Sequence, residues 1–502
     1  MSRRHSLAAL AVACAATLAG APAATAALQA PDTGKADGSG AACTTPPPVH
    51  VYPVYHCYTP QDIAGWYGVS ALHGAGNQGA GQTIVLVDSY GSPTAGADLQ
   101  KFHDAFYPQL PPPSFEQVCQ GSCHDYNNTA NGNGQSGPNA AEGWAGEANL
   151  DVQWAYAMAP RAHIVLLAVP PAETEGVQGF PNLFKAMSDA IARYPSGTVF
   201  SQSFGVTEQT FGGAAKTQTA KFDQVYQQAA KRDDTILASS GDDGTTGVDK
   251  QAKDSRTYPY ATVGWPASSP WVTAIGGTQL QDGWRWNPTS DVPFNADGSP
   301  NLAYWQWTDG PSSEAVWNES WLPAATGGGP SAIYPRPSWQ DGVASRIPGN
   351  ARAIPDLAWD AAVNGGVLVY TSFFPDRDRV GWHVYGGTSA SSPQVAGLIA
   401  LANEQQRQSG QPPLGWLNPL IYRVGAAQPS AFRDIVAQQY GTAVSGRLDS
   451  NRLFTGADDG QATKPGPVPG WPTTSGWDMT TGFGTPHAPQ FVAALRAARN
   501  AG

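Results

Sequence analysis

The chain has 502 residues, of which 41% are hydrophobic and only 13% are charged, and its formal net charge is −11. This composition is typical of a large globular protein with an extensive core, and it excludes an intrinsically disordered chain. The acidic balance argues against nucleic acid as a partner and against an anionic membrane surface.

The N-terminus is predicted to be an export signal. Arg3 and Arg4 precede the apolar, alanine-rich stretch 6–20, and a small-residue Ala-Thr-Ala cleavage site ends at residue 26. We therefore expect residues 1–26 to be removed and the mature protein to be secreted. Sec and twin-arginine export both remain open. No later stretch of the sequence is long and apolar enough to cross a bilayer.

Four cysteines follow the signal: Cys43, Cys57, Cys119 and Cys123. An even number of cysteines in an exported chain predicts disulfide bonds. We expect the pairs Cys43–Cys57 and Cys119–Cys123, because these close the shortest loops. A zinc site built from all four thiolates is the alternative.

Residues 27–57 form a Pro- and Thr-rich arm, and residues 58–502 have globular character. In this part, short and continuously apolar runs alternate with helical patterns, which predicts strands that are buried on both faces, as in a parallel sheet. We predict strands at 83–88, 163–169, 198–205, 235–242, 271–277 and 366–372, and helices at 97–107, 142–158, 182–194, 217–232 and 392–407. This alternation predicts an α/β layered fold whose mostly parallel central sheet is flanked by helices. Two Trp-, Pro- and Gly-rich stretches, 282–340 and 444–476, are predicted to be long surface loops.

The helical segment GEANLDVQWAYAMAP, residues 146–160, carries two acids four positions apart, Glu147 and Asp151. This spacing places both carboxyl groups on one helix face. Two carboxyl groups in a partly buried site do not both ionise readily, so one retains a proton. The pair is therefore a candidate proton relay. The alternative is two solvated acids on a helix surface.

The segment ASSGDDG, residues 238–244, ends an apolar strand and places Asp242 where α/β folds position functional groups. A carboxylic acid that keeps its proton can donate a hydrogen bond to a forming oxyanion. Asp242 is the candidate for this role at low pH. Asp243 is the competing candidate, and an ordinary Asp-Gly turn is the structural alternative.

The segment GGTSASSPQVAGLIAL, residues 386–401, places Ser389 before a helix that is predicted to start near Ser392. A helix N-terminus favours developing negative charge, which suits a nucleophile, although a Ser or Thr helix cap is the alternative. A serine needs an activating base, and no histidine motif of the HGTH type is present; LHGAG at 72–76 lacks the second His and the Thr. Glu147 is the candidate base, and its low reference pKa predicts activity at acidic pH.

Taken together, the three segments resemble the sedolisin family of serine-carboxyl peptidases. That family's pattern is a Glu and an Asp four apart, an Asp in an SGD segment and a Ser in GTSxSxP, in the order found here. Further family-like stretches include TPQDIAGWYGV at 59–69 and GWDMTTGFGTP at 476–486, and the resemblance covers roughly residues 58–497. It implies a subtilisin-like fold and hydrolysis of peptide bonds at acidic pH.

The resemblance implies a role for each candidate residue. Ser389 attacks the scissile carbonyl, and Glu147 accepts the serine proton and later donates it to the leaving amine. Asp151 holds Glu147, and Asp242 stabilises the oxyanion. Backbone groups of the segment 201–205 line the substrate cleft, which makes Ser201, Ser203 and Gly205 the predicted substrate-binding residues.

The resemblance also implies one structural calcium ion near the C-terminus. Asp434 and Asp478 would supply carboxylate oxygens, and all-oxygen ligation suits Ca²⁺. The carbonyl ligands would be those of Ile435, Thr474 and Gly476. Thr474 replaces a usual glycine, which a carbonyl ligand tolerates.

Sedolisin-like proteins usually carry a long propeptide, whereas only the arm at 27–57 separates the predicted signal from the globular part. We therefore expect a secreted, bacterial-type member that folds without a long covalent prodomain, aided by its disulfides and calcium. The expected substrates are proteins or peptides, cleaved internally by a monomer, with tripeptidyl-peptidase action left open. Two rival readings are a subtilisin-type peptidase of neutral pH and a catalytically silent peptide- or carbohydrate-binding protein, which the 17 tryptophans permit.

Overall fold

The computed structural model describes most of the chain from Cys57 onward. The described ranges are 57–121, 138–169, 176–249, 257–280, 284–286, 305–307, 314–319, 324–363, 365–373, 380–438, 448–455 and 464–501. The predicted signal peptide lies outside these ranges, as do Cys43 and Cys123. Cys57 and Cys119 are each disulfide-bonded, and the pairing of the four cysteines stays a prediction.

The centre of the molecule is a sheet with the strand order β12-β9-β7-β5-β2-β4-β3, in which β17 also pairs with β9. Neighbouring strands are parallel except for β12, which runs antiparallel to β9. The bounds are β2 Thr83–Asp88, β3 Ser114–Cys119, β4 His163–Ala168, β5 Val199–Gln202, β7 Thr235–Ser239, β9 Thr273–Leu280, β12 Glu314–Val316 and β17 Leu357–Asp360. The predicted mostly parallel sheet is confirmed.

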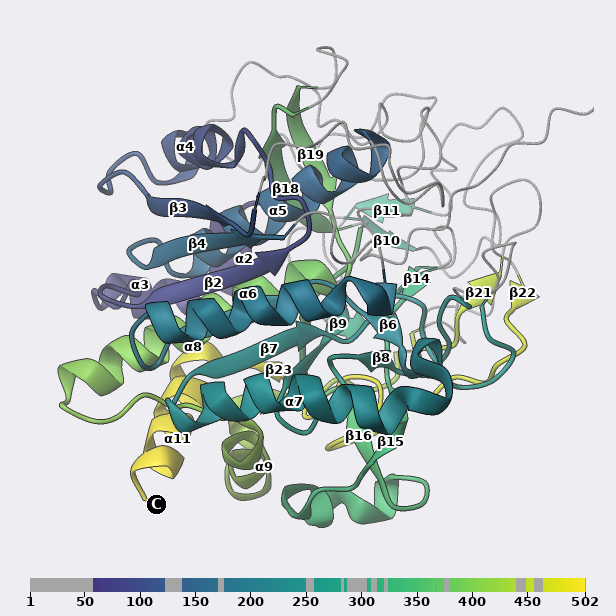
Figure 1. Cartoon of the computed structure of the whole chain (residues 1–502). Helices are drawn as coiled ribbons and strands as arrows, with labels where there is room; N and C mark the ends of the chain where they lie inside the picture. The colour runs from purple at the N-terminus through teal and green to yellow at the C-terminus, as the bar shows by residue number, and fades with distance from the viewer. Residues whose placement is uncertain are drawn as a thin grey trace, which may run out of the picture.

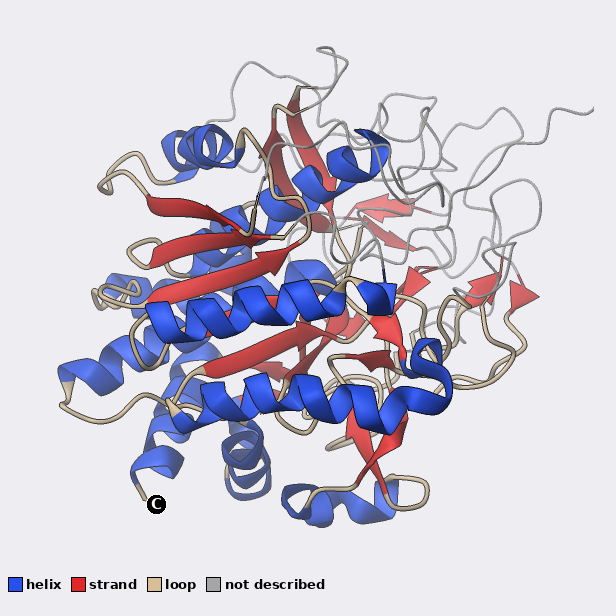
Figure 2. Ribbon diagram, in the orientation of Figure 1, coloured by secondary structure: helices blue, strands red, loops and turns tan. Residues whose placement is uncertain are grey.

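Helices cover both faces of this sheet (Figures 1 and 2). Successive side chains of a strand point to opposite faces, so Ile84 and Leu86 of β2 pack into one core while Val85 and Val87 pack into a second. The first core includes α5 Pro138–Met158 and α8 Thr388–Gln408, and the second includes α6 Phe180–Arg193 and α7 Ala215–Lys231. Burial on both faces explains why these strands are apolar throughout.

The predicted strand at 366–372 exists but does not belong to the central sheet. It is β18 Gly366–Thr371, which lies between β1 Cys57–Tyr58 and β19 Gly381–Tyr385 in a separate sheet. This small sheet is held against α5, because Gln153 and Trp154 donate side-chain hydrogen bonds to the carbonyls of Tyr370 and Leu368.

The remaining helices and strands complete the fold. The helices are α2 Pro60–Tyr67, α3 Val69–Gly74, α4 Ala95–Phe106, α9 Asn418–Ala427 and α11 Ala488–Asn500, with 3-10 turns at Gly176–Gln178, Glu208–Ala214, Ser338–Arg346 and Pro429–Ala431. The short strands are β6 Val206–Thr207, β8 Gly264–Trp265, β10 Trp284–Trp286, β11 Trp305–Trp307, β13 Asn318–Glu319, β14 Ala324–Ala325, β15 Gly329–Pro335, β16 Ala351–Ile354, β20 Phe432–Arg433, β21 Phe454–Thr455, β22 Lys464–Pro465 and β23 Thr485–Pro486. Among the described residues, none of the helices combines the length and hydropathy of a membrane span.

The stretch 282–340 is not simply a surface loop, and that prediction is wrong for its described part. Glu314 lies in β12 of the central sheet and is 4% exposed. Its carboxylate accepts hydrogen bonds from Tyr67 Oη at 2.6 Å and Thr278 Oγ1 at 2.6 Å, and from the Arg433 guanidinium at 2.9 Å. Through these hydrogen bonds, the buried Glu314 carboxylate links β12 to α2, β9 and β20.

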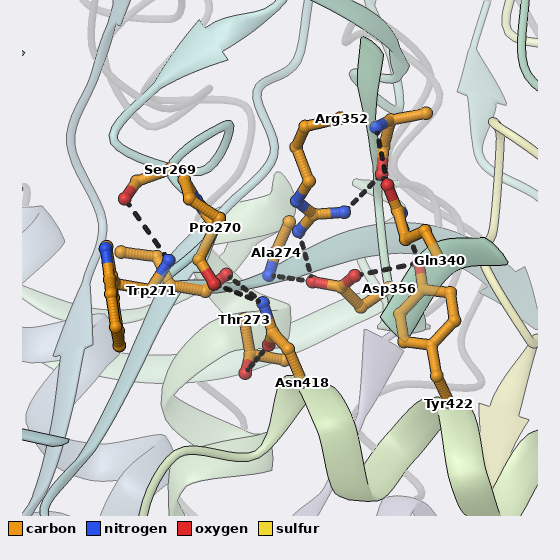
Figure 3. A network of polar contacts seen from close by, with 12 residues as sticks. Ser269, Pro270, Trp271, Thr273, Ala274, Gln340, Arg352, Asp356, Asn418 and Tyr422 are labelled. Atoms are coloured by element: carbon orange, nitrogen blue, oxygen red, sulfur yellow. Dashed lines mark hydrogen bonds and ion pairs between the residues drawn. The ribbon is translucent and has the colours of Figure 1, made fainter. Parts of the chain in front are cut away.

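A second buried network joins β9, β16, β17 and α9 (Figure 3). Asp356 accepts hydrogen bonds from Arg352 Nη2 at 2.6 Å, the Ala274 backbone N–H at 2.8 Å and Tyr422 Oη at 3.0 Å. Gln340 Nε2 donates to the oxygen of Tyr422 at 2.6 Å. Both side chains of the Arg352–Asp356 ion pair are 0% exposed, so neither charge has access to water.

Replacement of Arg352 by Met is expected to lower the free energy of unfolding by about 3–5 kcal/mol, because it leaves the buried Asp356 carboxylate without its cation. Arg336→Met is the matched control. Its ion pair with Asp341 is exposed, so the loss should stay below about 1 kcal/mol. Urea unfolding measures both values. Equal losses in the two variants would contradict a structural role for the buried pair.

Candidate active site

Several acidic or hydroxyl side chains meet at the carboxyl edge of the central sheet, where ligands bind in open α/β folds. Asp88 is the last residue of β2, Ser203 follows β5, and Asp242 follows β7. Because these strands are parallel neighbours in the order β7-β5-β2, their carboxyl ends lie at the same edge. All three side chains are buried.

Helices α5 and α8 run side by side in the same direction across the sheet. They approach each other closely at Gly397, where an added Cβ would clash with Met158. Their C-terminal ends also meet, because Gly79 packs on Ala159 and donates its backbone N–H to the Glu404 carboxylate. The earlier turns of both helices therefore point to the same edge of the sheet.

Two serines connect these helices, Ser201 in β5 and Ser203 directly after it. Ser201 Oγ lies 2.8 Å from Ser392 Oγ on α8, and Ser203 Oγ donates to Asp151 Oδ1 on α5 at 2.9 Å. Both serine side chains are 0% exposed, and each hydroxyl is engaged with a neighbouring helix. Backbone groups of this segment are therefore the ones left to contact a substrate, as the sequence analysis predicts. Gly205 supports a close approach there, since an added Cβ would lie 3.0 Å from the Trp265 carbonyl oxygen.

Ser389 and Glu147 both lie before the point where the two helices meet. Ser389 lies about one turn before Ser392 and about two turns before Gly397, and Glu147 lies about one turn before Asp151 and about three turns before Met158. Ser389 and Glu147 are 0% exposed. Ser389 Oγ has no hydrogen-bond partner among the described residues. A buried hydroxyl without a partner is costly, and such groups are typical of reactive sites.

Helix α8 begins at Thr388, so the prediction of a start near Ser392 is wrong and Ser389 lies in the first turn. The reason is a tertiary cap: Asp242 Oδ1 accepts hydrogen bonds from both the backbone N–H and the Oγ1 of Thr388, each at 2.8 Å. Gly387 precedes the helix at φ 93°, a conformation that favours glycine. Asp242 is thereby held beside Ser389.

Asp243, the competing candidate, has a different role in the backbone. It forms a bridge with Ala325, while the N–H of Gly244 and the carbonyl of Asp242 both pair with Ala325. The turn predicted for this segment therefore serves to fix Asp242 against β14. Of the two neighbouring acids, Asp242 is the one whose carboxylate contacts the helix that carries Ser389.

The structure adds one residue that the sequence analysis missed, Asp88. It is 0% exposed, and neither carboxyl oxygen has a hydrogen-bond partner among the described residues. Burial raises the pKa of Asp88 to about 8. Burial and then the charges of Asp88 and Glu147 raise the pKa of Asp151 well above its usual range. The sequence signal that could have identified Asp88 is its position at the end of the apolar run 83–88, which is the kind of position that was used to select Asp242.

The two segments predicted to bind calcium are adjacent. Asp434 Oδ2 accepts hydrogen bonds from the Gly476 N–H at 2.8 Å and Ser475 Oγ at 3.1 Å, and Asp478 Oδ2 accepts one from the Thr474 N–H at 2.8 Å. Asp434 Oδ1 accepts no hydrogen bond among the described residues. The described residues contain no cluster of three or more His, Cys, Asp or Glu side chains that would hold a metal. Two carboxylates with backbone carbonyls, Ile435 included, fit only an oxygen-seeking cation such as Ca²⁺.

Comparisons with known proteins bear on the family of this chain. The model of the Subtilase family matches residues 129–418, more than half of the chain. Kumamolisin from Bacillus sp. (strain MN-32) is 28% identical over 445 residues, covering 87% of this chain and 63% of that protein. Human tripeptidyl-peptidase 1 is 29% identical over 411 residues, covering 79% of this chain and 58% of that protein. The chain thus matches less than two thirds of the length of either relative.

A solved structure shares the fold of this chain. Pseudomonas sedolisin, a serine-carboxyl proteinase complexed with two molecules of pseudo-iodotyrostatin, superimposes with a TM-score of 0.62 at 25% sequence identity. The superposition covers 88% of this chain and 98% of that chain. The subtilisin-like fold predicted from the sequence is confirmed.

Replacement of Asp88 by Asn is expected to stabilise the protein at neutral pH. The folded state holds the Asp88 proton up to about pH 8, whereas the unfolded chain releases it near about pH 4. Wild-type stability therefore falls as pH rises through this window, and the variant should gain roughly 4 kcal/mol at pH 7 and nothing below about pH 4. Urea unfolding at several pH values measures this. Asp189→Asn, at an exposed position, is the control, and a pH-independent gain would refute the assignment.

Proposed function

Because this chain belongs to the subtilase family, and within it to the sedolisin-like serine-carboxyl peptidases, we propose that it is a secreted peptidase that hydrolyses peptide bonds at acidic pH. The observation that carries this proposal is the placement of Ser389. Its hydroxyl, which has no hydrogen-bond partner among the described residues, lies in the first turn of α8, and Asp242 is hydrogen-bonded to Thr388, the residue before it. The adjacent helix α5 presents Glu147 and Asp151 to the same edge of the sheet.

The proposed reaction begins when Ser389 Oγ attacks the carbonyl carbon of the scissile bond. Glu147 accepts the hydroxyl proton and then donates it to the amine of the leaving peptide, which leaves an acyl-enzyme. Water then attacks the carbonyl carbon of the acyl-enzyme while Glu147 accepts a proton from the water. Glu147 returns this proton to Ser389 Oγ, and the acid product is released. The packing of α5 beside α8 supports this assignment, as does the lack of a histidine hydrogen-bonded to Ser389 Oγ among the described residues.

Asp151 is proposed to position Glu147 rather than to react itself. Ser203 Oγ donates to one oxygen of Asp151 at 2.9 Å, and the raised pKa of Asp151 keeps a proton on this carboxyl group at acidic pH. A protonated Asp151 adds no negative charge next to Glu147, so it does not oppose the release of a proton from Glu147. Ser203 is therefore a positioning residue for Asp151.

Asp242 is proposed to stabilise the oxyanion, together with the positive end of the α8 dipole. One of its oxygens is held by Thr388, and this contact fixes the carboxyl group relative to Ser389. As a neutral carboxylic acid, Asp242 can donate a hydrogen bond to the developing negative charge. This requirement for a proton supports an acidic working range.

The proposed substrates are proteins or peptides bound in an extended conformation. The backbone that follows β5, residues 203–205, supplies N–H and C=O groups for pairing with such a chain. Kumamolisin and tripeptidyl-peptidase 1 are both among the similar proteins, and we propose internal cleavage as the main activity of this chain. The expected functional unit is a monomer.

Ser389→Ala and Glu147→Gln are each expected to lower kcat for cleavage of a denatured protein by about 10³-fold or more. The wild-type activity should peak below pH 5, because the base is a carboxylate with a low reference pKa. Release of peptides between pH 2 and 8 measures this profile. Ser391→Ala is the matched control on the same helix, since its hydroxyl is hydrogen-bonded to the carbonyls of Trp359 and Asp360.

Two outcomes of this experiment would overturn the proposal. An optimum above pH 7 that survives Glu147→Gln would assign the base to another residue. A folded protein without activity at any pH would favour the silent binding protein, for which the four candidate residues have no use. Retained activity in Ser391→Ala with loss in Ser389→Ala separates the nucleophile from a general effect on α8.

We further propose that one Ca²⁺ ion binds between Asp434 and the segment 474–478. The ion would join the loop after β20 to the loop before β23, and its role is structural. Millimolar Ca²⁺ at about 100 times its Kd should raise the free energy of unfolding by about 2.7 kcal/mol over the same protein in EGTA. Asp434→Asn should abolish this gain, whereas Asp104→Asn, at an exposed position on α4, should keep it. A calcium effect of the same size in Asp434→Asn would place the ion elsewhere.

A further inference from the structure

A cavity of about 420 Å³ opens at the edge of the central sheet opposite the candidate active site. Strands β7 and β9 begin at this edge, and the C-terminal ends of α7 and α11 and the start of α9 surround the opening (Figure 1). The nearest catalytic candidate on this part of the chain, Asp242, lies beyond the other end of β7. The cavity therefore belongs to a separate site, which the peptidase proposal does not use.

One wall of the cavity is a pair of tryptophans, Trp271 and Trp416, whose ring centroids lie 4.7 Å apart with an interplanar angle of 33°. Trp416 Nε1 donates to the Pro270 carbonyl at 3.1 Å. Asn418 Nδ2 donates to the same carbonyl at 3.2 Å. Asn418 Oδ1 in turn accepts from Thr273 Oγ1 at 2.5 Å (Figure 3). The bond from Trp416 Nε1 fixes the ring of Trp416, against which Trp271 packs, before any ligand binds. A preformed site loses less entropy on binding.

The rest of the lining combines apolar residues and Gln227 with a group of charged side chains. Lys231, Arg423 and Arg499 line the cavity together with one acid, Asp233, which is already paired with Arg499 at 2.7 Å. Lys231 is exposed and has no ion-pair partner among the described residues. In a chain whose net charge is −11, this excess of cations beside two aromatic rings is complementary to an anionic ligand.

We propose that this cavity binds a small aromatic carboxylate, the chemistry shared by an aromatic amino acid and the carboxyl-terminal aromatic residue of a peptide. The planar ring would stack on the Trp271–Trp416 pair, and the carboxylate would accept hydrogen bonds from Lys231 and Arg423. The volume lies in the range of small-molecule sites, about 300–1,000 Å³. The competing explanation is structural, because cations also stabilise helix C-termini such as those of α7 and α11.

The test is isothermal titration calorimetry with the full chain carrying Ser389→Ala, at pH 6.5, so that no peptide is hydrolysed. N-acetyl-tryptophan is expected to bind at least about tenfold more tightly than N-acetyl-tryptophanamide, which has the same ring without the charge. The peptide Gly-Gly-Trp forms the second arm. Binding of both carboxylates assigns the site to peptide carboxyl termini as well, whereas binding of N-acetyl-tryptophan alone restricts it to single residues.

Variants locate the binding. Lys231→Gln, at an exposed position that tolerates substitution, should weaken N-acetyl-tryptophan binding at least about fivefold, and Trp416→Leu should abolish it. Lys221→Gln is the matched control, an exposed lysine on the same helix that does not line the cavity. Equal affinity for the acid and the amide, an unchanged affinity in Lys231→Gln, or no binding at millimolar ligand would each overturn the proposal.

Discussion

The close, parallel contact of α5 with α8 determines where chemistry can take place in this protein. Only a glycine fits at position 397, where α8 meets Met158 of α5. This close contact fixes the position of one helix along the other. The serine of one helix and the acid pair of the other therefore face the same edge of the sheet. Strand β5 lies beneath both and fixes their register through Ser201 and Ser203.

This arrangement places several acids out of reach of water, which is energetically unfavourable. Asp88 has no hydrogen-bond partner among the described residues, and Asp151 has one from Ser203. The scaffold offsets such costs in other places, where buried acids are fully satisfied: Glu314 by α2, β9 and β20, and Asp356 by its arginine, a backbone N–H and a tyrosine. Buried acids with several donors, such as Glu314 and Asp356, therefore stabilise the fold, whereas buried acids with few donors, such as Asp88 and Asp151, retain their protons.

Local sequence patterns were sufficient to predict the elements whose residues are all buried in the same way. Strands such as β2 and β4 are buried on both faces and are apolar throughout, so their positions were predictable, and the spacing of Glu147 and Asp151 indicated one helix face. The start of α8 was not predictable, because its cap comes from Asp242, which lies far away in sequence. Short strands such as β12 were missed for the same reason: Glu314 is polar, and only its tertiary partners make it a core residue.

The direction of the helices also determines which edge of the sheet carries acidic side chains and which carries cationic ones. In a parallel α/β layer the helices run opposite to the strands, so helix N-termini gather at the carboxyl edge and helix C-termini at the amino edge. Asp242 caps the N-terminus of α8 at the first edge, and Lys231 and Arg499 lie in the last turns of α7 and α11 at the second. An acidic protein thereby acquires one edge suited to proton transfer and another suited to anions. Both properties follow from a single topology, before any side chain is specialised for catalysis or binding.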